Sequence, residues 1–205
     1  MLKKIIIFDL LGVITKEPMF ATNIVYPIVK DRVSYNLFKK KYLLYATGAI
    51  NRKEFWEFIC APKEIVKFEK KIFQKTKLTP EIKKIMSDLL ASGYILYLAT
   101  EIPKEWGELL LEKAGIKNMF KKKFYSSDLL STKPFARFYK IVFESIGNNE
   151  IFYVDDTPVN LLAAQKVKKH CSILYSPMDD VKIPESLNYK VGNLIKIKEI
   201  CEIKK

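Results

Sequence analysis

The stretch KKIIIFDLLGVI, residues 3–14, decides the fold of this chain. Residues 5–8 form an apolar run typical of a buried strand, and the run ends at Asp9 before apolar residues and Gly12 follow. A lone ionised carboxylate is costly in an apolar setting, so Asp9 must be paired, hydrogen-bonded, metal-bound or placed at an open edge. The stretch therefore predicts a buried strand with a polar group at its carboxyl end.

Four more segments have the composition of short buried strands. Two of them, within GYILYLAT and EIFYVDD, are near-continuous apolar runs rich in Ile, Val, Tyr and Phe, as expected where both faces of a sheet are covered. The four segments are residues 94–99, 123–126, 151–154 and 172–175. Helical patterns alternate with them, within residues 79–93, where Thr79 is a candidate cap, and over 105–114, 134–146 and 158–169. The alternation predicts an α/β protein with a doubly wound, mostly parallel, Rossmann-like sheet.

Residues 16–78 break this alternation, because they contain no strand-like run of useful length. Helical patterns occupy this block, around residues 18–30, 32–46, 51–60 and 62–75. We expect residues 16–78 to form a helical cap, inserted into a core made of residues 1–15 and 79–205. The aromatic residues Phe55, Trp56 and Phe58 are expected in the core of that cap.

The charge and the cysteines exclude several classes of function. The net charge is +13, but only Arg32, Arg52 and Arg137 are arginines, and proteins that read nucleic acids use arginine for bidentate contacts. No nucleic-acid partner is therefore expected. No apolar run reaches the ~20 residues of a membrane span, so no membrane partner is expected either. Three scattered cysteines indicate reduced thiols in a cytoplasmic protein. His170, the one histidine, is expected at a helix end, either solvated or facing the helix dipole.

Polar residues follow several of the predicted strands. Asp9, Thr100 and the pair Asp155–Asp156 would converge where parallel strands end, and Lys133 precedes a helix nearby. Taken singly, each aspartate is also explained as a turn residue or helix cap, Thr100 has little meaning, and Lys133 is also explained as a surface residue. Three carboxylates in one crevice require a cation, and ligands that are all oxygen favour Mg²⁺. Because Mg²⁺ favours a phosphate, which Lys133 and Thr100 could also bind, the pattern indicates phosphoryl transfer.

Four stretches carry a family resemblance. IIIFDLLGVI (5–14), LYLAT (96–100), STKP (131–134) and IFYVDDTPVN (151–160) resemble, in order, the four motifs of the haloacid dehalogenase-like hydrolase superfamily. The block after the first motif resembles the C1 helical cap of subfamily I. The resemblance covers almost the whole chain and implies a Rossmann-like core with a lid over the crevice.

The resemblance also implies roles for the residues that bind phosphate. Asp9 would attack phosphorus and form an aspartyl-phosphate, which water then hydrolyses. Thr100 would hydrogen-bond a phosphoryl oxygen, and Lys133 would neutralise its charge. Glu101 stands where small polar residues are common, and it would repel a phosphate dianion unless it pairs with a lysine or contacts a sugar hydroxyl.

The metal ligands follow from the same resemblance. Asp9, Asp156 and the backbone carbonyl of Leu11 would hold Mg²⁺, with Asp155 beside them or bound through water. Asn160 falls where the family often places a supporting acid or amide.

Leu11 departs from the family pattern, since phosphatases usually carry there a second aspartate that protonates the leaving group. General acid–base catalysis is worth ~10²–10⁴ in rate. One explanation is a phosphatase branch that lacks this acid, with Gly in its place, and acts on sugar phosphates. A substrate with a good leaving group, such as an anomeric or acyl phosphate, would need the acid less. A second is a 2-haloacid dehalogenase, but that branch uses no metal, lacks the paired acids and needs an early arginine, where this chain has Lys16. A third is a catalytically weak relative that binds a phosphorylated ligand or a protein.

The sequence thus predicts a Mg²⁺-dependent phosphatase of modest activity, acting on a small phosphorylated metabolite such as a sugar phosphate. A monomer or homodimer is expected.

Overall fold

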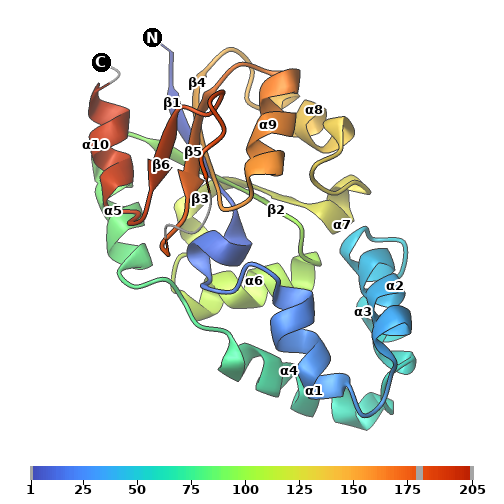
Figure 1. The fold of residues 1–205 in the computed structure, drawn as a ribbon. Coiled ribbons are helices and arrows are strands. Elements are labelled where there is room, and N and C mark those ends of the chain that lie inside the picture. Colours follow the sequence, from blue (N-terminus) through green and yellow to red (C-terminus); the bar gives the residue numbers. More distant parts are fainter. Residues whose placement is uncertain (1, 179–181, 204–205) are drawn as a thin grey trace.

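The computed structural model describes residues 2–178 and 182–203, which form a six-stranded sheet flanked by helices (Figure 1). The sheet order is β3-β2-β1-β4-β5-β6, and every pairing is parallel. The strands are β1 (Lys4–Phe8), β2 (Ile95–Thr100), β3 (Phe120–Tyr125), β4 (Glu150–Asp155), β5 (Cys171–Tyr175) and β6 (Tyr189–Val191). The predicted α/β class with a doubly wound parallel sheet is therefore confirmed.

The residues of β1 alternate between two hydrophobic layers. Ile6 and Phe8 belong to the layer that contains residues of α5 (Ile82–Ala91), α6 (Lys104–Lys113) and α10 (Lys196–Ile203). Ile5 and Ile7 belong to the opposite layer, with residues of α8 (Ala136–Glu144) and α9 (Pro158–Val167). Because both faces of the sheet are covered, the strand reads as a continuous apolar run rather than an alternating one.

The helices between β1 and α5 lie together at one end of the molecule, beyond α6 and α7 (Ser126–Leu129) (Figure 1). They are α1 (Tyr26–Val29), which continues a helical turn over Ala21–Val25, and α2 (Tyr35–Ala46), α3 (Arg52–Glu57) and α4 (Ile65–Lys75). Their apolar residues, including Phe38, Phe55 and Trp56, join the same hydrophobic layer as Trp106 of α6. The block 16–78 is helical as expected, and its interior is continuous with that of the core.

A buried carboxylate also links this helical block to α6. Glu69 of α4 is 5% exposed and accepts hydrogen bonds from the indole nitrogens of Trp56 and Trp106, each at 2.9 Å. The guanidinium of Arg52 donates two further bonds to the same carboxylate, one of them 2.7 Å long. Burial raises the pKa of Glu69, but the bonds from Arg52 and the two indoles outweigh it and lower the pKa overall. The carboxylate therefore stays charged inside the protein.

Several element boundaries differ from the expectation. β3 begins at Phe120, three residues early, because an edge strand tolerates the exposed lysines 121 and 122. Helix α5 begins at Ile82, and the hydroxyl of Thr79 donates to the carbonyl of Val13 at 2.5 Å instead of capping the helix. Strand β6 and helix α10 were not expected, because β6 is only three residues long and α10 is rich in charged residues.

Two side chains and one further helix start differ from the expectation. Phe58 is 45% exposed, with the Lys41 ammonium 3.4 Å from its ring centre, so it is not a core residue. Helix α8 begins at Ala136, inside the predicted range 134–146, and Phe135 before it is 67% exposed. His170 is buried rather than solvated, since its ring lies against Phe143 and Tyr153.

The division into a core and a cap stays a prediction, and residues 1, 179–181 and 204–205 of the predicted core lie outside the described residues. Within the described ranges, no helix combines the length and the apolar character that a membrane crossing requires.

Candidate active site

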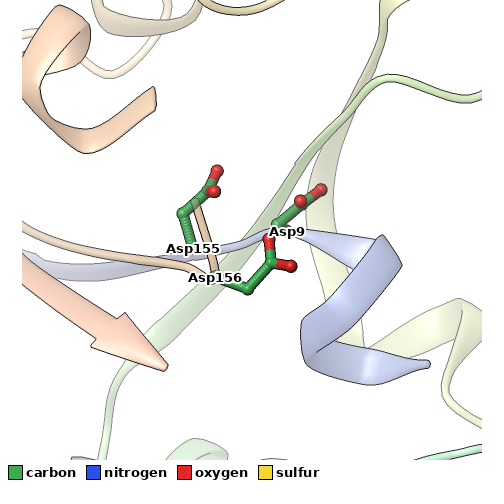
Figure 2. Close-up of side chains that lie close together, drawn as sticks. All are labelled: Asp9, Asp155 and Asp156. Atoms are coloured by element: carbon green, nitrogen blue, oxygen red, sulfur yellow. The ribbon is translucent and has the colours of Figure 1, made fainter. Parts of the chain in front are cut away.

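The carboxylates predicted to meet are brought together where β1 and β4 end. These two strands are neighbours in the sheet, and the chain leaves them in opposite directions, which makes their ends the usual ligand site of an open parallel sheet. Asp9 follows β1, Asp155 ends β4 and Asp156 comes next. One carboxylate oxygen from each lies within 4.8 Å of the other two (Figure 2).

Lys133 is the cation of this cluster. Its ammonium lies 2.7 Å from Asp155 Oδ2 and 3.1 Å from Asp9 Oδ2, and its side chain is fully buried. Burial lowers the pKa of Lys133, but the charges of Asp155 and Asp9 outweigh this effect and raise the pKa well above its usual value. Lys133 therefore stays protonated and fixes the directions of two carboxylates.

Asp155 is held by hydrogen bonds on both of its oxygens. Its Oδ1 accepts from the backbone N–H of Thr157 at 2.9 Å and from Asn160 Nδ2 at 3.1 Å, while Oδ2 faces Lys133. These donors occupy most of the lone pairs that a metal would need. The structure thus gives Asp155 an orienting position, and it places Asn160 against Asp155.

Asp9 and Asp156 have more lone pairs available. Leu10 N–H donates to Asp9 Oδ1 at 2.7 Å, and the Thr157 hydroxyl donates to Asp156 Oδ1 at 3.2 Å. Burial raises the pKa of both carboxyls, that of Asp9 to about 6 and that of Asp156 to about 7, and neighbouring carboxylates add to the rise. One lysine against three carboxylates leaves excess negative charge, so the cluster fits a hard divalent cation.

The turn after Asp9, over Leu10–Ile14, carries no second acid. The side chain of Leu11 packs against the hydrophobic layer, and its backbone is extended. Gly12 has a φ of 76°, and a Cβ there would lie 2.1 Å from Asp156 Oδ2. Glycine is therefore required for the turn to approach Asp156. The Leu11 carbonyl stays a predicted ligand.

The end of β2 supplies two polar groups. The Thr100 hydroxyl is fully buried and has no hydrogen-bond partner among the described residues. Such a group costs free energy unless a ligand satisfies it. The next residue, Glu101, is partly buried, and burial raises its pKa to about 7, with Lys133 opposing the rise and Asp9 and Asp155 adding to it.

A cavity of about 500 Å³ lies between the helical block and the strand ends. Its polar lining includes Thr22, Lys39, Lys40 and Tyr42 from the block, together with Glu101 and Thr132 from the core. Sequence reasoning missed Tyr42, Thr132 and the two lysines, since only the packing of α2 brings them to this place. Thr157 was also missed, although its position directly after the paired acids was a usable signal.

Comparisons with known proteins agree with this arrangement. A family model described as haloacid dehalogenase-like hydrolase matches residues 6–172. A search of curated proteins finds no match to the chain.

Solved structures share the fold over nearly their whole length. The HAD phosphatase from Thermococcus onnurineus has 18% identity and a TM-score of 0.71, with 97% of each chain covered. The 2-haloacid dehalogenase from Pseudomonas syringae pv. Tomato DC3000 has 14% identity and a TM-score of 0.72, covering 99% of this chain and 100% of that one. The putative HAD-hydrolase YfnB from Bacillus subtilis, bound to magnesium, has 16% identity and a TM-score of 0.68, with 98% and 99% covered. At these identities the likeness shows a shared fold.

Proposed function

The chain belongs to the haloacid dehalogenase-like hydrolases, and from this premise we propose that it is a Mg²⁺-dependent phosphatase of small phosphorylated metabolites. The observation that carries the proposal is the cluster of Asp9, Asp155 and Asp156 beside a single lysine. A cluster with this excess of negative charge is suited to bind a divalent cation together with a dianionic phosphate.

The residues of the cluster divide the work of a two-step hydrolysis. Asp9 attacks phosphorus, the bond to the leaving oxygen breaks, and water then hydrolyses the aspartyl-phosphate. Asp9 and Asp156 would hold Mg²⁺, which offsets the charge on the carboxylates and on the phosphoryl group. Lys133 orients Asp9 and would contact a phosphoryl oxygen.

Thr100 adds independent support. Its buried hydroxyl, next to the strand ends, has no partner within residues 2–178 and 182–203, and a phosphoryl oxygen in the crevice would accept its hydrogen bond. Residues 16–78, which border the cavity above Glu101, would act as the cap that excludes water and selects the substrate.

A 2-haloacid dehalogenase is the second candidate, favoured by Leu11 and by dehalogenases among the structural neighbours. The paired acids Asp155 and Asp156 argue against it, because the resemblance implies that dehalogenases neither keep them nor use a metal. Lys16, where those enzymes have an arginine soon after the first motif, is a second argument against it.

A catalytically weak protein that binds a phosphorylated ligand or a protein partner is the third candidate. Leu11 favours it too, since this residue leaves the turn without an acid. It differs from the phosphatase in one measurable respect, namely whether Asp9 becomes phosphorylated.

The test measures Mg²⁺-dependent phosphate release from sugar phosphates, acyl phosphates and p-nitrophenyl phosphate. Wild type is compared with Asp9→Asn, with Leu11→Asp, and with Asp31→Asn, a control at an exposed aspartate. Activity that disappears only in Asp9→Asn supports the proposal. Halide release from 2-chloropropionate without phosphate release supports the dehalogenase, and phosphatase activity that appears only in Leu11→Asp supports a disabled enzyme.

A further inference from the structure

Position 11 has a counterpart on the neighbouring strand. Ile5 of β1 pairs with Ile95 of β2, and Phe8 pairs with Leu98. The same offset, carried past the last pair, places Leu11 opposite Glu101. The turn that contains Leu11 contacts β2, so the two chain segments remain neighbours beyond the end of the sheet. The turn after β1 has no carboxylate at position 11, but the neighbouring strand β2 is followed by one, that of Glu101.

Glu101 lines the cavity between α2 and the strand ends and belongs to neither hydrophobic layer. It lines the space together with Thr132, close to Lys133 in sequence, and with Lys39, Lys40 and Tyr42 of α2. Glu101 and Thr132 are the chain neighbours of Thr100 and Lys133, the two residues that would contact the phosphoryl group. A substrate whose phosphoryl group met Asp9 would therefore extend its leaving group toward this space. Glu101 thus stands on the leaving-group side of the crevice.

The charges around Glu101 suit a group that gives up a proton. Burial raises the pKa of Glu101 to about 7, with Lys133 opposing the rise and Asp9 and Asp155 adding to it. A carboxyl group whose surroundings favour its protonated form can give a proton to a leaving group.

Tyr42 belongs to the same arrangement. Its buried hydroxyl has no hydrogen-bond partner among the described residues, and both burial and the charge of Glu101 raise its pKa. The tyrosine therefore stays protonated and its hydroxyl can donate. A donor near Glu101 would orient the carboxyl group or the oxygen of the leaving group.

We propose that Glu101 is the general acid of this enzyme and takes the role that the residue at position 11 cannot fill. This inference rests on the proposed phosphatase function. As the Asp9 Oδ–P bond forms and the bond from phosphorus to the leaving oxygen breaks, the Glu101 proton moves to that oxygen and the product leaves as an alcohol. The Glu101 carboxylate then takes a proton from the water that attacks the aspartyl-phosphate. Phosphate is released, and both side chains return to their starting states.

The test uses a series of phosphate monoesters that differ only in the leaving group, from dinitrophenyl through phenyl to alkyl. A general acid matters most when the leaving group is a strong base. The Glu101→Gln variant should retain kcat/KM within about threefold for dinitrophenyl phosphate and lose ~10²-fold or more for alkyl phosphates. Glu144→Gln, at an exposed glutamate of α8, is the matched control and should follow wild type throughout.

Two variants keep the result interpretable. Glu101→Asp retains a carboxyl group and should recover part of the loss on alkyl phosphates. The double variant Leu11→Asp/Glu101→Gln places an acid after β1 instead of after β2. It should also recover part of the activity on alkyl phosphates. Thermal unfolding of each variant separates a loss of catalysis from a loss of folded protein.

The possible failures are distinct. If wild type releases phosphate and Glu101→Gln loses the same factor on every ester, or loses nothing, the role of Glu101 is refuted while the phosphatase stands. If wild type releases no phosphate from any ester, the phosphatase is refuted, and the role of Glu101 with it.

Discussion

The buried carboxylate of Glu69 should contribute substantially to the stability of the protein, because it joins three helices. It receives hydrogen bonds from Arg52 of α3, Trp56 of α3 and Trp106 of α6. Glu69→Ala removes the acceptor for all of these donors at once. The variant tests whether the helical block is fastened to the core by this cluster.

The magnitude follows from the donors that are left behind. The indole N–H groups of Trp56 and Trp106 are buried, and each unsatisfied buried donor costs ~1–3 kcal/mol. The side chain of Arg52 is 39% exposed, so water can solvate it and its loss adds little. Glu69→Ala should therefore lower the free energy of unfolding by about 3–5 kcal/mol, which also agrees with breaking one side of a buried pair. For a chain of this size that is a fall in Tm of about 10 °C.

The assay is urea unfolding followed by tryptophan fluorescence, since the two tryptophans of the chain are the two donors. Glu57→Ala is the control, because Glu57 is exposed and only pairs with Lys53 on the same helix at 3.8 Å. It should change the free energy of unfolding by less than ~0.5 kcal/mol. A change for Glu69→Ala as small as that of the control would refute the reasoning.

The same cluster predicts a pH effect. The pKa of Glu69 is lower in the folded state than in the unfolded chain. Its contribution is therefore present above the unfolded pKa, about 4.3, and is lost as the pH falls through the folded value. The stability difference between wild type and Glu69→Gln should shrink on acidification, and a difference that stays constant would contradict this.

Further predictions concern the carboxylate cluster. Gly12→Ala should weaken Mg²⁺ binding about tenfold or more by calorimetric titration, because the added Cβ displaces Asp156. The control is Gly147→Ala, which should not weaken it, since Gly147 also has a positive φ, 67°, but has open space around it. Lys133→Met leaves the carboxylates of Asp9 and Asp155 without their cation, so in the absence of Mg²⁺ its free energy of unfolding should be lower by about 3–5 kcal/mol. Added Mg²⁺ should restore part of this free energy. An unchanged Tm would contradict the pairing. Burial raises the pKa of Asp156 to about 7, so without a metal the protonated carboxyl group stabilises the folded state. In EDTA, the free energy of unfolding of wild type should therefore fall relative to that of Asp156→Asn as the pH rises from about 4 to about 7. A difference between these two proteins that does not vary with pH would refute the last prediction.

The sheet and most of the site could be predicted from the sequence, because both depend on local sequence patterns. Strands covered on both faces are continuous apolar runs, and the residue at which each run stops is the residue that reaches the crevice. Asp9, Thr100 and Asp155 each stand at such a stop. Neighbouring parallel strands then bring their ends together, whatever the sequence between them.

Other features depended on contacts between distant segments. Phe58 and Phe55 lie on the same short stretch, yet only Phe55 is buried, because the docking of α3 selects which ring faces inward. His170 was expected at a helix end, solvated or facing the helix dipole, but the packing of Phe143 and Tyr153 encloses it. Periodicity indicates that a helix has an apolar face, whereas the partner of that face is set by the tertiary structure.

The α/β class, the acids at the strand ends and the lack of an acid at position 11 follow from residue type and local pattern, so they were predictable from the sequence. That Glu101 and Tyr42 line one cavity depends on tertiary packing, because α2 brings Tyr42 there. The position of α2 depends on aromatic packing against Trp106, more than sixty residues away along the chain. No local pattern encodes a contact of that kind, because it depends on how two separately formed elements fit together.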